Sequence, residues 1–138
     1  MADGQSCPED KLVLVVDDDP GIVGLFTETV RSEGFRVASA TDGEEALEQV
    51  ATLKPDLILL DLMLPGYGGY EVIQELKTGG GNQTPVVVIS GRFADKSVAA
   101  KLKVEPTVVA FLDKPIKPLD LIELLHKTLK TVPRKKGK

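Results

Sequence analysis

The sequence predicts a doubly wound α/β domain, in which a five-stranded parallel sheet carries helices on both faces. Short apolar runs alternate five times with segments of helical periodicity, and short connections join them. Two of the runs, Lys11–Val16 and Leu57–Leu60, are apolar apart from Lys11 at the start of the first, as expected of strands buried on both faces. A chain of 138 residues suits one such domain. For five strands the order 2-1-3-4-5 is common, and we take it as the prediction.

The first strand leads into a helix through Asp17, Asp18, Asp19 and Pro20. Asp19 suits the N-cap of this helix, and Pro20 suits its first turn, where a missing N–H costs no hydrogen bond. Gly34 is predicted to end the helix, because glycine readily adopts the left-handed conformation found after a last turn. The apolar face of the helix consists of Ile22, Leu25, Phe26 and Val30.

The second strand is expected over residues 35–40, and the sequence at 41–44, Thr-Asp-Gly-Glu, is typical of a helix start. The strand over 57–60 then leads to Asp61, and a Pro-Gly pair at 65–66 turns the chain away from the sheet. The remaining elements continue the alternation. They are a helix containing Val72, Ile73 and Leu76, a strand over 85–89, a helix over 94–103, a strand over 107–112 and a helix over 119–129.

The domain body is expected over residues 11–130, between a flexible leader over 1–10 and a basic tail or linker start over 131–138. The leader lacks the basic and apolar segments of a signal peptide, and no apolar run approaches the roughly 18–20 residues of a transmembrane helix. We therefore expect a cytoplasmic protein without membrane insertion. The single cysteine, Cys7, excludes an intrachain disulfide and a cysteine metal cluster.

The net charge of −4 conceals a more acidic body. Four of the 17 basic residues lie in the last six positions, and without them 13 Lys and Arg face 21 Asp and Glu, a balance of about −8. An acidic body is not expected to bind nucleic acid directly. The basic tail is typical of a solvated end or of the start of a linker.

Polar residues that follow the strands are predicted to meet at one edge of the sheet, where the carboxyl ends of parallel strands lie together. Three carboxylates that converge there would repel one another unless a cation neutralised them. Oxygen ligands without His or Cys favour Mg²⁺, with Mn²⁺ as an alternative, and Mg²⁺ would leave room for a phosphate. The residues are Asp17 and Asp18 after the first strand, Asp61 after the third, Ser90 after the fourth and Lys114 after the fifth.

The same edge has the composition of a phosphoryl site. Lys114 supplies a compact positive charge and Ser90 a hydroxyl donor. A carboxylate held between Mg²⁺ and a lysine can attack phosphorus and form an acyl phosphate, which needs one nucleophilic Asp and separate metal ligands. Each residue also has an ordinary structural interpretation: Asp61 as a cap or a solvated carboxylate, Ser90 as a turn hydroxyl and Lys114 as a solvated lysine.

Four motifs, taken in order, resemble the receiver domain of two-component response regulators. They are VVDDDP at 15–20, DLILLDLMLPG at 56–66, VISG at 88–91 and FLDKP at 111–115. The similarity covers about residues 11–130 and implies the flavodoxin-like receiver fold. It further implies that Asp61 accepts a phosphoryl group with the help of Mg²⁺, and that the domain then changes conformation and slowly dephosphorylates itself.

The resemblance also implies roles for the other residues of the site. Lys114 and Ser90 would contact the phosphoryl group beside Asp61 and act with it in catalysis, and the Lys114–Pro115 peptide bond would be cis. Ser90 and Phe111 would form the conformational switch, although Phe111 also suits an ordinary core position. The implied metal ligands are Asp18 and Asp61 directly, Asp17 through water, and the backbone carbonyl of Met63.

Two other functions are open to such a site. Mg²⁺-dependent phosphatases with an aspartyl nucleophile usually place a second Asp two residues later, where this chain has Met63, so we expect a phosphoacceptor rather than an enzyme. A pure interaction module is disfavoured by the complete set of site residues. Met63 and Arg92 would flank the path of the hydrolytic water, and we hypothesise that they prolong the life of the acyl phosphate. His126 lies away from the site and is expected at the surface or partly buried.

The implied partner is a histidine kinase or a histidine phosphotransfer protein. An effector or a second copy is expected on the face formed by the fourth helix, fifth strand and fifth helix. The last helix motivates this expectation, because its apolar residues span more than one face. These residues are Leu121, Ile122, Leu124 and Leu125. The chain would be either a stand-alone regulator or the N-terminal part of a longer one.

Overall fold

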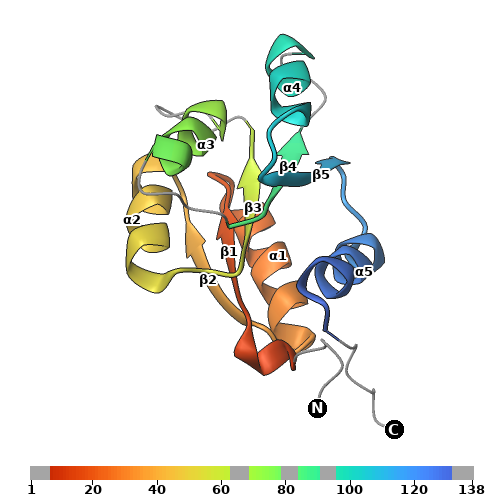
Figure 1. The fold of residues 1–138 in the computed structure, drawn as a ribbon. Helices are drawn as coiled ribbons and strands as arrows, with labels where there is room; N and C mark the ends of the chain where they lie inside the picture. Colours follow the sequence, from red (N-terminus) through yellow and green to blue (C-terminus); the bar gives the residue numbers. More distant parts are fainter. Residues whose placement is uncertain (1–6, 63–68, 79–83, 91–95, 132–138) are drawn as a thin grey trace, which may run out of the picture.

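Five parallel strands form one sheet in the order β2-β1-β3-β4-β5, which confirms the predicted fold class (Figure 1). The structure is a computed structural model, and it describes residues 7–62, 69–78, 84–90 and 96–131. The strands are β1 (Leu12–Val16), β2 (Arg36–Ala40), β3 (Leu57–Asp61), β4 (Val86–Ser90) and β5 (Val108–Asp113). The helices are η1 (Pro8–Asp10, a 3-10 helix), α1 (Pro20–Ser32), α2 (Gly43–Leu53), α3 (Gly69–Thr78), α4 (Lys96–Lys103) and α5 (Pro118–Leu129).

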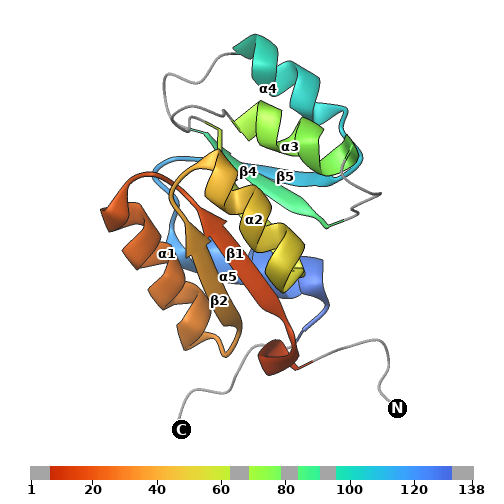
Figure 2. The same cartoon turned by 90° about the vertical axis from the view of Figure 1, so that its left-hand side faces the viewer.

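Helices cover both faces of the sheet, as Figures 1 and 2 show. Alternate strand residues point to opposite faces, so each strand contributes to two separate cores. On one face, Leu14, Ile58 and Val88 pack with residues of α2, α3 and α4. On the other face, Leu59 and Val87 pack with residues of α1 and α5. Every residue of β1, β3 and β4 is buried, which explains why their sequences are continuous apolar runs.

The register of the strands brings their carboxyl ends to one edge of the sheet. Val16 of β1 is level with Leu60 of β3, so Asp17 and Asp61 follow at the same height. One strand further along the sheet, Asp61 is paired with Ile89 of β4. Backbone hydrogen bonds continue past the strand ends, from Asp17 N to the carbonyl of Ala40 at 3.1 Å and from Leu62 N to the carbonyl of Ile89 at 2.9 Å. These bonds fix the backbone on which the site is built.

The helix ends follow the local chemistry of the sequence. The carboxylate of Asp19 accepts a hydrogen bond from Gly21 N at 2.9 Å and caps α1, and that of Asp42 accepts one from Glu45 N at 2.8 Å and caps α2. Gly34 has φ 97°, in the left-handed region that glycine adopts without strain, and it follows the end of α1 as predicted. The capping of α1 by Asp19 leaves Asp17 and Asp18 available to the edge of the sheet.

Some expectations for single segments were wrong. The last residues of the predicted leader, Pro8–Asp10, form η1, and the guanidinium of Arg36 donates hydrogen bonds to the carbonyls of Glu9 and Asp10. His126 is not at the surface but buried, with 6% of its area exposed, because it bonds to buried polar partners. The strands β4 and β5 each begin and end one residue later than predicted. Within the described residues, no helix combines the length and apolarity needed to cross a membrane.

Candidate phosphoryl and metal site

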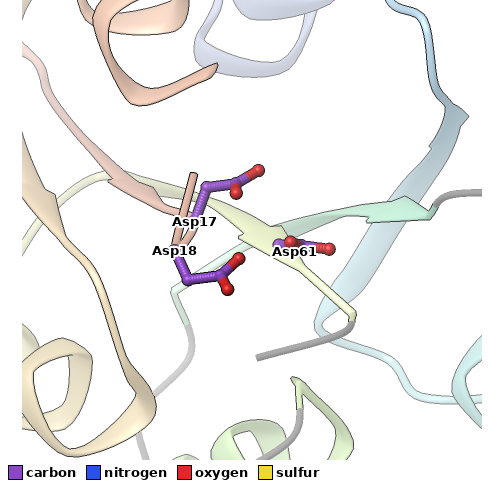
Figure 3. A group of neighbouring side chains, drawn as sticks. All are labelled: Asp17, Asp18 and Asp61. Carbon is purple, nitrogen blue, oxygen red and sulfur yellow. The ribbon is translucent and has the colours of Figure 1, made fainter. Parts of the chain in front are cut away.

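Three carboxylates converge at the carboxyl edge of the sheet. One carboxylate oxygen from each of Asp17, Asp18 and Asp61 lies within 4.8 Å of the other two, and Figure 3 shows the three side chains at the ends of β1 and β3. Asp17 is 1% exposed and Asp61 is 3% exposed, whereas Asp18 is exposed. The convergence that the strand pattern predicts is therefore present, with two of the three acids inside the protein.

The two oxygens of Asp17 have different surroundings. Oδ1 accepts a hydrogen bond from Asp19 N at 2.9 Å, which fixes the side chain. Oδ2 is fully buried and lies 3.2 Å from Lys114 Nζ, but it has no hydrogen bond of good geometry among the described residues. A buried carboxylate oxygen without a hydrogen bond is costly, and it is better satisfied by a second cation. The group therefore fits a hard divalent ion such as Mg²⁺, for which carboxylate oxygens are the usual protein ligands.

Lys114 supplies the positive charge at the site. Its ammonium lies 3.2 Å from Asp17 Oδ2 and 3.5 Å from Asp61 Oδ2, and its side chain is 27% exposed. Desolvation lowers the pKa of Lys114, but the charges of Asp61 and Asp17 outweigh it, so that the pKa is raised above its ordinary value. The Lys114–Pro115 peptide bond is cis, as the resemblance implies.

Ser90 ends β4 and is buried, with 7% of its area exposed. Its hydroxyl donates a hydrogen bond to Oδ1 of Asp113 at 3.0 Å, and its carbonyl accepts one from Lys114 N at 2.9 Å. The sequence interpretation gave no role to Asp113. The signal that could have found it is the register of β4 and β5, in which Ser90 and Asp113 are direct partners.

Of the remaining predicted residues, Phe111 is among those that the structure describes. Phe111 is half-buried in β5, packs against the core on the α2, α3 and α4 face, and lies under Lys103, whose Nζ is 5.8 Å from the ring centroid. Its surroundings suit a core aromatic, and its role as a switch stays a prediction. Met63, the predicted carbonyl ligand, and Arg92 lie outside the described residues.

Among the described residues of the site, one lysine lies opposite three acids, which is an excess of negative charge. A divalent cation would balance this excess and would then attract the oxygens of a phosphoryl group to the same place. Lys114 is positioned to contact such a group on the side of Asp61 and Asp17, since it lies within 3.5 Å of both. The geometry therefore suits the binding of a phosphoryl group next to Asp61.

Comparison with known proteins finds relatives by sequence and by fold. A sequence profile described as response regulator receiver domain matches residues 13–126. The DNA-binding response regulator MtrA of Mycolicibacterium smegmatis is 38% identical over 118 residues, which make up 86% of this chain and 50% of that protein. The transcriptional regulatory protein PhoP of Bacillus subtilis, which is named for alkaline phosphatase synthesis, is 36% identical over 111 residues, or 80% of this chain and 45% of PhoP.

Solved structures agree with this assignment. A CheY-like response regulator receiver domain protein from Methanospirillum hungatei superposes with a TM-score of 0.78 and 26% identity, covering 87% of this chain and 94% of that one. The receiver domain of the Francisella response regulator 1452 superposes with a TM-score of 0.76 and 28% identity, covering 87% and 97%. The chain spans about half the length of the curated relatives it matches.

Proposed function

The chain belongs to the response regulator receiver domain family of two-component systems, and from this premise we propose that it accepts a phosphoryl group on Asp61 and changes conformation in response. The observation that carries the proposal is the convergence of Asp61 with Asp17, Asp18 and Lys114 at one edge of the sheet. A buried nucleophilic carboxylate, separate metal ligands and a fixed cation are the groups that this transfer requires.

The proposed reaction is a single displacement at phosphorus. A carboxylate oxygen of Asp61 forms a bond to the phosphorus of a phosphohistidine, and the bond between phosphorus and the imidazole nitrogen breaks. The nitrogen keeps the electron pair of that bond, so a phosphohistidine that is protonated on its other ring nitrogen leaves as neutral imidazole. Hydrolysis later transfers the phosphoryl group to water and restores the carboxylate. We propose that this hydrolysis is slow, so that the chain acts as a signalling phosphoacceptor rather than as an enzyme on external substrates.

Mg²⁺ would be held by Asp17, Asp18 and Asp61, with Mn²⁺ as a possible substitute and with the carbonyl of Met63 as a further ligand. When bound, the ion neutralises charge on the carboxylates and on the incoming phosphoryl oxygens. Asp17 supports this assignment most directly, because its buried Oδ2 has no hydrogen bond among the described residues. The hydrogen bond from Asp19 N to its other oxygen keeps Asp17 in place before any ion arrives.

Lys114 orients the reactants through charge. It lies 3.5 Å from Asp61 Oδ2 before transfer, and we propose that it then binds an oxygen of the attached phosphoryl group. The raised pKa keeps its ammonium protonated throughout the neutral range. Ser90 would donate its hydroxyl to another phosphoryl oxygen, and Phe111 would turn inward with it, which makes these two residues the proposed switch.

The phosphoryl donor is proposed to be a histidine kinase or a histidine phosphotransfer protein. The relatives MtrA and PhoP are named as a DNA-binding response regulator and a transcriptional regulatory protein, and this chain matches about half of each. The receiver domain would therefore act either alone or as the N-terminal part of a longer regulator. Its acidic body makes direct contact with nucleic acid an unfavourable role for this domain itself.

Acetyl phosphate, a small phosphoryl donor, tests the proposal without knowledge of the kinase. The chain incubated with acetyl phosphate and Mg²⁺ is expected to gain the mass of one phosphoryl group, seen by intact-mass spectrometry. The gain should be absent with EDTA and absent in Asp61→Asn, which is nearly isosteric but not nucleophilic. Asp56→Asn is the matched control, since Asp56 is an acid just before β3 that bonds to Leu12 N, outside the site.

A gain in mass that survives Asp61→Asn would show that another residue takes the phosphoryl group and would overturn the assignment. The absence of any gain in the wild-type chain would favour a pure interaction module. Steady release of phosphate from a small phosphate ester, lost in Asp61→Asn, would instead favour the phosphatase. The three outcomes distinguish the three functions that the site residues allow.

A further inference from the structure

Ser90 lies on β4 between two strands that each end in a carboxylate. β3 on one side ends at Asp61, and β5 on the other side ends at Asp113. A serine hydroxyl has only one proton to donate, so it can satisfy one of these neighbours at a time. In this structure the proton is directed to Asp113, through a hydrogen bond of 3.0 Å. The bond ties the hydroxyl to the strand on the side away from Asp61.

The two partners of this bond differ in burial. Ser90 is 7% exposed, so its hydroxyl would be left without an acceptor if it simply let go of Asp113. Asp113 is exposed, so water can solvate its carboxylate when the hydrogen bond to Ser90 breaks, and little free energy is lost. The hydroxyl therefore leaves Asp113 only when another acceptor is offered, and the phosphoryl group on Asp61 is such an acceptor, with three anionic oxygens.

We propose that Asp113 is a positioning residue that holds the Ser90 hydroxyl on the β5 side and thereby sets how readily Ser90 engages a phosphoryl group on Asp61. This inference rests on the proposed function, because it needs a phosphoryl group at Asp61. Asp113 competes with that group for a single proton. A chain with a weaker acceptor at this position reaches the phosphoryl-engaged arrangement more easily.

The position of Phe111 connects this competition to the rest of β5. Side chains two apart on a strand share a face, so Phe111 and Asp113 lie on the same face of β5. Their partners on β4 are Val88 and Ser90 in turn. Release of Ser90 from Asp113 removes a side-chain hydrogen bond between the ends of β4 and β5, on the face where the Phe111 ring packs.

The test measures the affinity of the chain for beryllofluoride, a mimic of the phosphoryl group, in the presence of Mg²⁺. Asp113→Ala removes the competing acceptor and is expected to bind about three- to tenfold more tightly than wild type, since a charge-assisted hydrogen bond is lost only from the unliganded state. Asp113→Asn keeps an acceptor but loses the charge, so its affinity should fall between the two. Glu48→Gln, which neutralises an exposed acid on α2, should leave the affinity unchanged.

A double-mutant cycle with Ser90→Ala separates positioning from a general effect of charge. Ser90→Ala should weaken binding, and adding Asp113→Ala to it should then change nothing, because no hydroxyl remains to be held. An equal gain from Asp113→Ala with and without Ser90 would overturn the inference, as would an Asp113→Ala chain that binds like wild type. If the wild-type chain binds no beryllofluoride, or if Asp61→Asn binds it as tightly as wild type, the proposed function is wrong. The inference, which rests on that function, is then wrong as well.

Discussion

Lys114 balances the charge of the buried carboxylates in the unliganded site. Its ammonium lies near two buried carboxylates, 3.2 Å from Asp17 Oδ2 and 3.5 Å from Asp61 Oδ2. Buried charges are tolerated only when a partner compensates for lost hydration, and here one ammonium compensates for two neighbours at once. The same arrangement makes Lys114 and a divalent cation partial substitutes for each other, because both neutralise the same acids.

Replacing Lys114 by Met is expected to lower the free energy of unfolding by about 2–3 kcal/mol without Mg²⁺. This is less than for a fully buried ion pair, because water reaches part of the lysine. Mg²⁺ should bind more tightly to this variant, since the acids have lost their cation. Thermal unfolding with and without Mg²⁺ measures both effects, and Lys127→Met, at an exposed position on α5, is the control. A variant as stable as wild type without Mg²⁺ would contradict this account.

The pH dependence of this difference has a defined direction. The pKa of Lys114 is raised in the folded chain, so the stabilising interaction is complete below the ordinary lysine pKa of about 10.4. It is lost as the pH rises above that value and the ammonium gives up its proton in the folded state. The gap in stability between wild type and Lys114→Met should therefore be constant from pH 7 to about pH 9.5 and should shrink only above that range.

The site residues differed in how well the sequence could reveal them. Asp17 and Asp61 follow apolar runs directly, and Lys114 comes two residues after its own run, so the end of each run determined where they would lie. Asp113 follows its strand in the same way, but its importance depends on which strand is its neighbour and on the register that pairs it with Ser90. Register between strands far apart in sequence is a tertiary property, and hydrophobic periodicity does not encode it.

At the scale of elements, the strands that are buried on both faces were predicted from continuous apolar runs, but the runs did not fix their ends, since β4 begins and ends one residue later than predicted. All residues of β1, β3 and β4 are buried, and a short apolar run bounded by turn residues is typical of such a strand. The edge strands β2 and β5 are partly exposed, so their ends are less marked in sequence. The order of the strands was a choice among allowed topologies, and the structure confirms it.

A buried polar network that the sequence did not reveal joins the end of α1 to the end of α5. His126 Nε2 lies 2.9 Å from Glu33 Oε1, and Nδ1 lies 2.6 Å from Thr131 Oγ1. All three residues are buried, and the imidazole lies 5.1 Å from the ring of Phe35. Glu33 and His126 are 93 positions apart, so only the packing of the two helices brings them together. A lone histidine in a sequence gives no sign of such partners.

His126→Ala is expected to lower the free energy of unfolding by about 2–4 kcal/mol, because it leaves a cavity and removes a hydrogen-bond partner from buried Glu33. Uptake of the phosphoryl group from acetyl phosphate should be unchanged below the melting temperature. The reason is topological: α1 begins at the site edge after β1, so its last residues lie at the other end of the sheet. Denaturant unfolding gives the first quantity and intact-mass spectrometry the second.

Thr131→Val is a smaller change to the same network, since it removes one hydroxyl and leaves the volume of the side chain nearly constant. Its expected cost is about 1 kcal/mol, and it too should leave phosphoryl uptake intact. If both variants lost phosphoryl uptake as well as stability, the network would reach the site, contrary to this account.

At the scale of the whole molecule, the exposed apolar side chains indicate where a partner would bind. The prediction from α5 was partly wrong, because Leu121 and Leu125 are fully buried in the core and Ile122 and Leu124 are partly buried. These residues are buried because α5 packs beside α1 on the same face of the sheet. Exposed apolar residues in the described part of the chain include Leu25 of α1 and Leu53 of α2. Three others lie on or next to α4, β5 and α5. They are Val104 after α4 at 79% exposed, Val109 of β5 at 48% and Leu119 of α5 at 72%.

These three residues lie on or next to α4, β5 and α5, the elements that flank Ser90, Asp113 and Phe111 along the chain (Figure 1). A change at the end of β5 would therefore be transmitted first to this surface.

We predict that beryllofluoride with Mg²⁺ promotes self-association of the chain, and that Leu119→Glu abolishes it, since a charge in an apolar contact must lose its hydration. Light scattering gives the mass with and without beryllofluoride. Leu53→Glu, at an exposed apolar position at the end of α2, is the control and should associate like wild type. A mass that is the same with and without beryllofluoride would leave this surface to an effector of another kind, and loss of association in both variants would place the contact elsewhere.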